Sequence, residues 1–377
     1  MDFEKSTYRR LVNLQGVCLE QGIPFVSYRL PLHTEIKTLV QHASEPAELS
    51  LAGPVDNLSG FVMSPFSVNA RHGAFLLEPD STFSGDNIEP AFIEWLSGNK
   101  RFVPVQKNIA KEMKTTPETV YIHQVATAIK EMEAGKFHKV VLSKIRVENL
   151  EENFDIPGFY LKLCEKYRYA FVYLIQLPGA GCWLGASPEP LLLVEGETVK
   201  TVSLAGTQLA SESKIGPYVW SEKEIEEQCI VTDFVEKTLR SLGVREFTKE
   251  GPVNFRAANL IHLQTSFEFP KSELGDGLGK VLNALHPTPS VGGLPKTEAC
   301  HFISSNEAHD RDYYTGFLGP LNVDGKTALY VNLRCLQLFD KQFVLYSGAG
   351  ITMSSIAERE WEETDNKMLT MLNVMKG

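Results

Sequence analysis

The stretch that decides the fold class lies near the end of the chain: Ser347-Gly348-Ala349-Gly350-Ile351, followed by Glu360-Trp361-Glu362-Glu363-Thr364-Asp365-Asn366-Lys367. The glycines predict a turn that leaves a strand, and the charged residues after it predict a helix. Glu360, Glu363 and Lys367 have the spacing i, i+3 and i+7, which places them along one helix face. Two carboxylates suit a hard divalent cation, and exposed backbone amides suit a carboxylate anion. The stretch therefore predicts a site for a small acid held by Mg²⁺, although an ordinary solvated helix end has the same pattern.

The composition of the chain argues against several classes of function. The 377 residues are 43% hydrophobic and carry a formal net charge of −10, which indicates one large or two smaller domains with a sizeable core. The negative charge argues against nucleic acid or an anionic membrane as the main partner. We see no apolar signal segment and no membrane-spanning apolar run, so we expect a cytoplasmic protein. The six cysteines form no C-x-x-C pair, which argues against a zinc site.

A β-rich run at Phe137–Ile145 contains a lysine in register with apolar residues. The period of two places Lys139, Val141 and Ser143 on one face of the predicted strand. Such a lysine is either partly buried or extends its ammonium group to water from the start of the strand. The pattern alone leaves both alternatives open.

Two further carboxylates stand out by their surroundings. Glu189 lies between two prolines in a predicted turn, where the backbone is restricted. Ser221 and Glu224 form a capping box, which predicts a helix from Glu222 to Ser241, with Glu227 one turn beyond the cap. Taken alone, these carboxylates fit exposed turn and helix positions as well as they fit a site.

The last third of the chain predicts a meander of three strands, at Gly316–Val323, Thr327–Leu338 and Phe343–Ser347. Arg334 falls within the middle strand between apolar neighbours, and a buried arginine needs an anionic partner. His262 lies in an earlier predicted strand, where a lone histidine is usually a satisfied core residue.

Together these stretches resemble the chorismate-utilising enzymes, and within them the isochorismate synthases. Eight motifs come in family order over residues 137–377, and it is their order that makes the resemblance specific: Lys139–Lys144, Gly185–Glu189, Leu204–Thr207, Glu227, His286–Pro289, Leu333–Cys335, Ser347–Ile351 and Glu360–Lys367.

The resemblance implies an α+β fold, in which two extended β-sheets stack face to face with helices outside. It also implies that residues 111–377 form the chorismate-binding catalytic core, and that residues 1–110 are a variable N-terminal part of the same fold.

The resemblance further implies a role for each matched side chain. Lys139 resembles the general base that activates water, and Glu189 resembles the general acid that protonates the departing hydroxyl. Glu227 and Glu363 resemble the Mg²⁺ ligands, with Glu224 and Glu360 supporting them. The residues that resemble the substrate-binding set are Gly206, Thr207, His262, Ser290, Arg334, Gly348 and Lys367.

The implied reaction moves a hydroxyl group around the chorismate ring: water adds at C2, the double bonds shift and the C4 hydroxyl leaves. It needs a base and an acid but no redox cofactor. A free lysine titrates near ~10.4, so burial and Mg²⁺ have to lower the pKa of Lys139 toward roughly 7–8. Conversely, an apolar pocket has to raise the pKa of Glu189 so that it keeps its proton. Arg334, helped by the Gly348 backbone, suits the enolpyruvyl carboxylate of chorismate.

The resemblance also leaves alternatives. A salicylate synthase would share Lys139 and would go on to eliminate pyruvate, whereas anthranilate synthases use ammonia and typically lack this lysine. Ala205 stands where aminodeoxychorismate synthases carry a nucleophilic lysine. An alternative from another class is a catalytically idle chorismate-binding homologue. We expect a monomeric Mg²⁺ enzyme without a glutaminase subunit, whose product serves menaquinone or siderophore biosynthesis.

Overall fold

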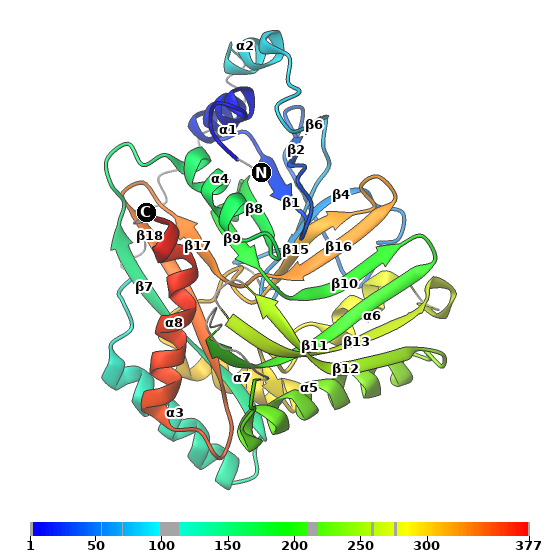
Figure 1. The fold of residues 1–377 in the computed structure, drawn as a ribbon, viewed down its shortest axis with the longest axis vertical. Coiled ribbons are helices and arrows are strands. Elements are labelled where there is room, and N and C mark those ends of the chain that lie inside the picture. Colours follow the sequence, from blue (N-terminus) through cyan, green and yellow to red (C-terminus); the bar gives the residue numbers. More distant parts are fainter. Residues whose placement is uncertain are drawn as a thin grey trace.

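The structure is a computed structural model that describes residues 3–53, 55–69, 71–98, 113–209, 218–257, 260–274 and 277–375. Over these residues the chain forms two antiparallel nine-stranded sheets that lie against each other, with helices on the outer faces (Figure 1). The predicted α+β architecture of two stacked sheets is confirmed.

The first sheet has the strand order β14-β7-β18-β17-β9-β8-β1-β2-β6. Its strands are β1 Phe25–Arg29, β2 Lys37–Val40, β6 Ser81–Ser84, β7 Lys139–Asn149, β8 Phe171–Leu177, β9 Gly181–Ser187, β14 Gly293–Leu294, β17 Cys335–Leu338 and β18 Gln342–Ile351. The long pair of β7 and β18 lies next to the short edge strand β14, and β18 carries the C-terminal glycine-rich run.

The second sheet has the strand order β12-β13-β11-β10-β16-β15-β4-β5-β3. Its strands are β3 Ala47–Glu48, β4 Gly60–Ser64, β5 Phe75–Leu77, β10 Pro190–Glu195, β11 Thr198–Leu209, β12 Thr248–Ala257, β13 Leu260–Pro270, β15 Phe317–Leu321 and β16 Lys326–Val331. Strands from the N-terminal part enter both sheets, because β1 pairs with β8 and β4 pairs with β15.

Helices cover the outer face of each sheet. Their bounds are α1 Arg9–Gln21, α2 Pro90–Gly98, α3 Glu118–Glu133, α4 Ile156–Lys166, α5 Glu222–Ser241, α6 Leu278–Leu285, α7 Lys296–Asn306 and α8 Ala357–Met375, with a 3₁₀ turn at Lys271–Leu274. The apolar sides of α1, α4 and α8 share a core with the first sheet, and those of α5 and α6 share a core with the second. The capping box at Ser221 forms, and α5 begins and ends where the sequence predicts.

Strand β8 shows why the sheets stack. All seven of its residues are buried. Val172 and Leu174 point into the core under the helices, whereas Phe171, Tyr173 and Ile175 point into the core between the two sheets. Since alternate residues of a strand face opposite sides, a strand with apolar residues on both faces needs a layer on each side.

Two of the predicted elements are wrong. The predicted strand Thr327–Leu338 is split into β16 and β17, which belong to different sheets, and Arg334 lies between them with a φ of 48°. A continuous strand cannot change sheets, so the backbone has to turn there. The predicted glycine-rich turn at Ser347–Ile351 is instead the last part of β18, paired along its length with β7.

Candidate active site

The site is formed at two crossings, which are segments where the chain passes from one sheet to the other. Strand β9 of the first sheet continues through Pro188 and Glu189 into β10 of the second, and β16 of the second continues through Arg334 into β17 of the first. The crossings are hydrogen-bonded to each other, since the amide of Val331 donates to the carbonyl of Glu189 (2.9 Å) and the amide of Ala186 donates to the carbonyl of Arg334 (3.0 Å). Glu189 and Arg334 therefore lie side by side in the fold.

A pocket lies at these crossings, between the two sheets. Ten of the predicted site residues line it: Glu189, Gly206, Thr207, Glu227, His262, Ser290, Arg334, Gly348, Glu363 and Lys367. They come from both sheets and from α5 and α8. The predicted residues outside this lining are Lys139, Glu224 and Glu360.

Lys139 is the first residue of β7, and its side chain is fully buried. Its ammonium nitrogen lies 2.9 Å from the Glu227 carboxylate, which does line the pocket. Of the two alternatives that the sequence left open for this lysine, the structure therefore has the buried one.

Glu189 is buried at the crossing between β9 and β10, with 3% of the residue exposed. Burial raises the pKa of Glu189 to about 7, although Lys139 and then Ser290 act to lower it. A carboxyl with this pKa holds its proton in a large fraction of molecules at neutral pH, as a general acid requires.

Three other predicted carboxylates each pair with a lysine. Glu227 on α5 pairs with Lys139, Glu363 on α8 pairs with Lys367 (2.6 Å), and Glu360 on α8 pairs with Lys223 (2.5 Å).

The pairs act differently on the partly buried Glu227 and the buried Glu360. Burial opposes the charge of Glu227, but Lys139 and Lys223 outweigh it and hold the pKa of Glu227 below its ordinary value. For Glu360 burial prevails over Lys223 and raises the pKa. The pocket thus holds an ionised Glu227 beside the buried Lys139.

Glu224 has a different environment. Its carboxylate accepts hydrogen bonds from the amide (2.7 Å) and the hydroxyl (2.9 Å) of Ser221 and from the side-chain amide of Gln208 (3.1 Å). These contacts make it the capping carboxylate of α5.

Glycine at position 350 permits the contact between Lys139 and Glu227. A Cβ atom on Gly350 would lie 2.0 Å from the Glu227 carboxylate and 3.2 Å from Cε of Lys139. Any larger side chain would have to displace one of these groups. Sequence reasoning missed Gly350 as a functional position, although the repeated glycines two residues apart in a strand are a signal of close approach.

Two cationic side chains, Arg334 and Lys367, also line the pocket. Arg334 is buried, and burial lowers the pKa of Arg334 to about 10. Among the described residues, its guanidinium donates one hydrogen bond, from Nη1 to the Thr370 hydroxyl (3.3 Å). Lys367 donates to the carbonyl of Gly348 (2.9 Å). Gly348 therefore offers its carbonyl to Lys367, and the remaining Arg334 donors can serve an anion in the pocket.

His262 presents a free ring nitrogen to the pocket. Its Nδ1 lies 2.9 Å from the carbonyl of Gly206, and because a carbonyl can only accept, Nδ1 carries the proton. Its Nε2 is buried and has no hydrogen-bond partner among the described residues. Burial, then the charges of Arg334 and Lys367, lower the pKa of His262 to about 3. The neutral ring is therefore a fixed acceptor for a hydroxyl group.

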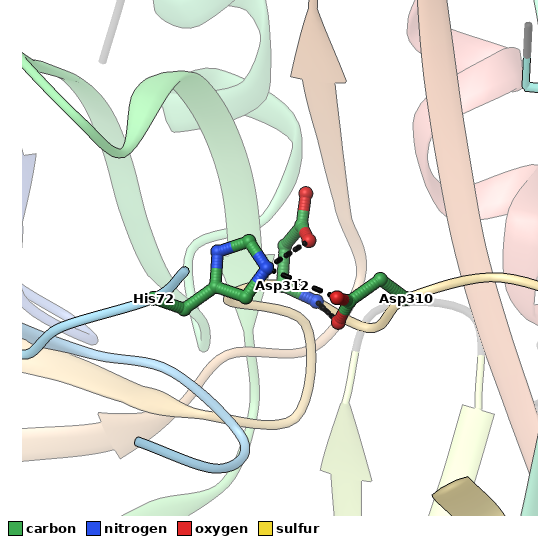
Figure 2. A group of neighbouring side chains, drawn as sticks. All are labelled: His72, Asp310 and Asp312. Carbon is green, nitrogen blue, oxygen red and sulfur yellow. Dashed lines mark hydrogen bonds and ion pairs between the residues drawn. The ribbon is translucent and has the colours of Figure 1, made fainter. Parts of the chain in front are cut away.

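A second group of charged side chains lies away from this pocket. Figure 2 shows His72 facing Asp310 and Asp312, with ring Nε2 at 3.0 Å from a carboxylate oxygen of each. The ligand atoms of these three residues lie within 4.8 Å of one another. None of the three residues lines the pocket that contains Glu189.

Within the described part of the chain, no helix is long and apolar enough to cross a membrane.

The part of the chain that builds the pocket matches known proteins. Residues 87–376 match a family model described as chorismate binding enzyme. The chain is 30% identical to isochorismate synthase EntC of Escherichia coli (strain K12) over 282 residues, which cover 73% of this chain and 72% of that protein. It is 27% identical to the vibriobactin-specific isochorismate synthase of Vibrio cholerae over 272 residues, 71% of this chain and 69% of that one. Its fold matches the solved structure of MenF, the menaquinone-specific isochorismate synthase of Escherichia coli, with a TM-score of 0.76 at 20% identity, over 96% of this chain and 90% of that one.

Proposed function

Since this chain belongs to the chorismate-binding enzyme family, we propose that it is an isochorismate synthase, an isomerase that converts chorismate to isochorismate. One observation carries the proposal. The buried Lys139 lies against Glu227, and Glu227 lines the same pocket as the buried Glu189. An acid thus lines the cavity, and a base contacts a carboxylate in the wall of the same cavity, as the addition of water at one carbon and the loss of hydroxyl at another require.

The base of the proposed reaction is Lys139. In the structure its ammonium group is paired with the Glu227 carboxylate, so it would first have to lose a proton; the free amine would then take a proton from the water that attacks C2 of chorismate. Its full burial at the start of β7 and its contact with Glu227 hold the nitrogen at one place beside the pocket. Holding a reacting group in position supplies a large part of catalysis, because the entropy cost of orienting it has already been met before the reaction.

The acid is Glu189, which would give its proton to the departing C4 hydroxyl. Its pKa of about 7 leaves the carboxyl protonated in a useful fraction of molecules near neutral pH. The free Nε2 of His262 suits a hydroxyl group of the ring as an acceptor. No redox step is involved, since water enters and hydroxide leaves with the proton from Glu189.

The carboxylates on α5 and α8 suit a magnesium ion. Glu227 and Glu363 supply oxygen donors to one pocket, and Glu360 lies beside them on α8. When bound, Mg²⁺ would neutralise the ring carboxylate of chorismate. In the structure, Lys139 and Lys367 form ion pairs with these carboxylates. These ion pairs would have to break or rearrange when the ion binds. Arg334 suits the second carboxylate, on the enolpyruvyl group.

The direct test is product analysis of chorismate incubated with the protein and Mg²⁺. We expect isochorismate as the product and no salicylate, and we expect ammonium salts to add no anthranilate. Formation of salicylate or anthranilate would contradict the proposed function. The relatives include enzymes of both menaquinone and siderophore routes, and either could use the product here. A monomeric state, a cytoplasmic location and the roles assigned to residues 1–110 and 111–377 stay predictions.

A further inference from the structure

A buried ion pair outside the pocket joins three parts of its wall. Arg311 and Glu307 lie in the segment between α7 and β15, and their side chains are 3% and 2% exposed. The guanidinium holds the carboxylate with two hydrogen bonds, from Nε to Oε2 (2.8 Å) and from Nη2 to Oε1 (2.6 Å). Such a fork uses only part of the donors of an arginine, so the others are free to bind elsewhere.

The remaining donors of Arg311 reach the backbone of the pocket wall. Nη2 donates to the carbonyl of Val141 on β7 (2.7 Å), and Nη1 donates to the carbonyl of Val291 (2.8 Å) and to the hydroxyl of Thr315 (3.3 Å). Val141, Val291 and Thr315 all line the pocket. All five N–H groups of the guanidinium therefore donate a hydrogen bond, and three of them donate to residues that line the pocket.

Glu307 extends the same network to the strand that carries Lys139. Its Oε1 accepts from the amide (2.6 Å) and the hydroxyl (2.9 Å) of Ser143 on β7. The ring of Phe66 covers the guanidinium of Arg311 at 4.5 Å, which shields it from water. The pair is therefore satisfied on both sides, as a buried ion pair has to be.

We infer that Arg311 is a positioning residue, which fixes the backbone of the pocket wall next to the general acid Glu189. This inference rests on the proposed function. The residue next to its partner Val291 is Ser290, whose hydroxyl donates to the carbonyl of Leu204 (2.9 Å) and acts to lower the pKa of Glu189. Through Val291 the guanidinium holds the segment with Ser290, and through Val141 it holds β7, which begins at Lys139. A shift of about 1 Å in such a wall is enough to lower a rate by roughly 10²-fold.

The test compares two buried arginines. Arg29 is also almost fully buried, and it donates to five backbone carbonyls: those of Leu30, His33, Tyr167, Arg168 and Ala170. None of these five residues lines the pocket with Glu189. Arg29→Lys is therefore the matched control for Arg311→Lys, since both changes keep the charge and lose the planar fork.

We expect Arg311→Lys to lower kcat by about 10–100-fold, while KM for chorismate and the Kd for Mg²⁺ from calorimetry change by less than about threefold. The binding groups Arg334, Lys367 and Glu363 come from other segments, so a loss confined to kcat separates positioning from general damage. Arg29→Lys should lower the melting temperature without lowering kcat. Equal losses of kcat in both variants, or an unchanged kcat in Arg311→Lys, would overturn the inference.

A milder variant keeps the inference testable if Arg311→Lys does not fold. Phe66→Leu removes the ring that covers the guanidinium and leaves the ion pair in place. We expect kcat to fall by about 3–10-fold with KM preserved, and wild-type kcat in the folded variant would contradict the inference. A wild-type chain that makes no isochorismate from chorismate and Mg²⁺ overturns the proposed function and this inference together. An active wild-type chain beside an equally active variant overturns only the inference.

Discussion

Two clusters in this chain pair a cation with carboxylate groups, and they differ in what surrounds them. In the pocket, Lys139 and Glu227 are held by β7 and α5, next to a cavity that both sheets line. On the surface, His72 lies between Asp310 and Asp312, whose side chains are 42% and 19% exposed (Figure 2). In this second group the imidazolium satisfies both carboxylates, and Asp310 also accepts from the amide of Asp312.

The difference that matters between the two clusters is their exposure to solvent. Charges in a buried pocket act on each other with little screening, so their protonation states can be set for chemistry. Exposed charges are screened and contribute modestly to stability. We therefore expect changes in the pocket to act on activity, and changes in the His72 group, defined as His72, Asp310 and Asp312, to act on stability alone.

The largest expected effect follows from the loss of the base. Lys139→Ala should lower kcat by about 10³-fold, within the range of 10²–10⁴ that general bases contribute. Binding of chorismate in the presence of Mg²⁺ should persist, because the binding groups stay in place. Steady-state kinetics and calorimetry measure the two quantities. The control is Lys200→Ala, which removes a strand lysine from an exposed pair with Glu268. Full activity in Lys139→Ala would refute the role of the lysine.

The next effect concerns the proposed magnesium ion. Glu363→Gln removes a charged oxygen donor that lines the pocket, and it should weaken Mg²⁺ binding by about 10–100-fold and chorismate binding with it. Titration of activity against Mg²⁺ measures the change. Glu358→Gln, at an exposed position on the same helix, is the control. An unchanged Mg²⁺ dependence in Glu363→Gln would count against its role as a ligand.

The pH dependence of the reaction tests the acid. Burial raises the pKa of Glu189 to about 7, and only the protonated carboxyl can give a proton to the leaving group. As pH rises through about 7 the protonated fraction falls, so kcat/KM should decline about tenfold per pH unit on the alkaline side. A rate profile from pH 6 to pH 9 measures this limb. A flat profile over that range would show that Glu189 does not act as the acid.

A smaller effect is expected from crowding the pocket wall. Gly350→Ala would place a Cβ atom at 2.0 Å from the Glu227 carboxylate, and Glu227 or Lys139 would have to move. We expect a loss of roughly 1–3 kcal/mol in the free energy of unfolding, with a lower kcat. Gly16→Ala in α1 is the control, because nothing lies within 4 Å of its added methyl and alanine favours a helix. Denaturant unfolding distinguishes the two, and a fully stable, fully active Gly350→Ala variant would contradict the close approach.

The smallest effect is expected at the His72 group. Hydrogen bonds from Asp310, then Asp312, raise the pKa of His72 to about 9. Because this pKa lies above the ordinary value, the group's stabilisation is complete below about 6.5 and is lost as pH rises through about 9. Asp312→Asn should lower the free energy of unfolding by about 1 kcal/mol at pH 6 and by less at pH 10, since solvent screens the group. Activity should not change, and a loss of kcat in Asp312→Asn would break the distinction between the two clusters.

The local elements of this fold could be predicted from short patterns. The capping box at Ser221 determined where α5 begins, since it satisfies two amides that no helix can pair internally. The spacing of Glu360, Glu363 and Lys367 predicted a helix face, and α8 presents Glu363 and Lys367 to the pocket. The almost continuous apolar run of β8 is typical of a strand that is buried on both faces.

The predictions failed where the chain changes sheets. Arg334 was expected within one long strand, because its neighbours are apolar on both sides. Instead it lies at a crossing with a positive φ, and the hydrogen bonds that hold this crossing come from the crossing at Glu189, well over a hundred positions earlier in the chain. A pattern of neighbouring residues contains no information about such a partner.

Neighbouring residues were enough to predict local elements such as the start of α5 and the helix face of α8, together with the order of the motifs and the kinds of charge that the chain carries. The tertiary structure alone decided that Lys139 is buried against Glu227, that Gly350 leaves room for that contact and that Arg311 joins three parts of the pocket wall. These contacts join groups far apart in the chain, and their protonation depends on burial and on the charges around them. Both exist only when the two sheets have packed together.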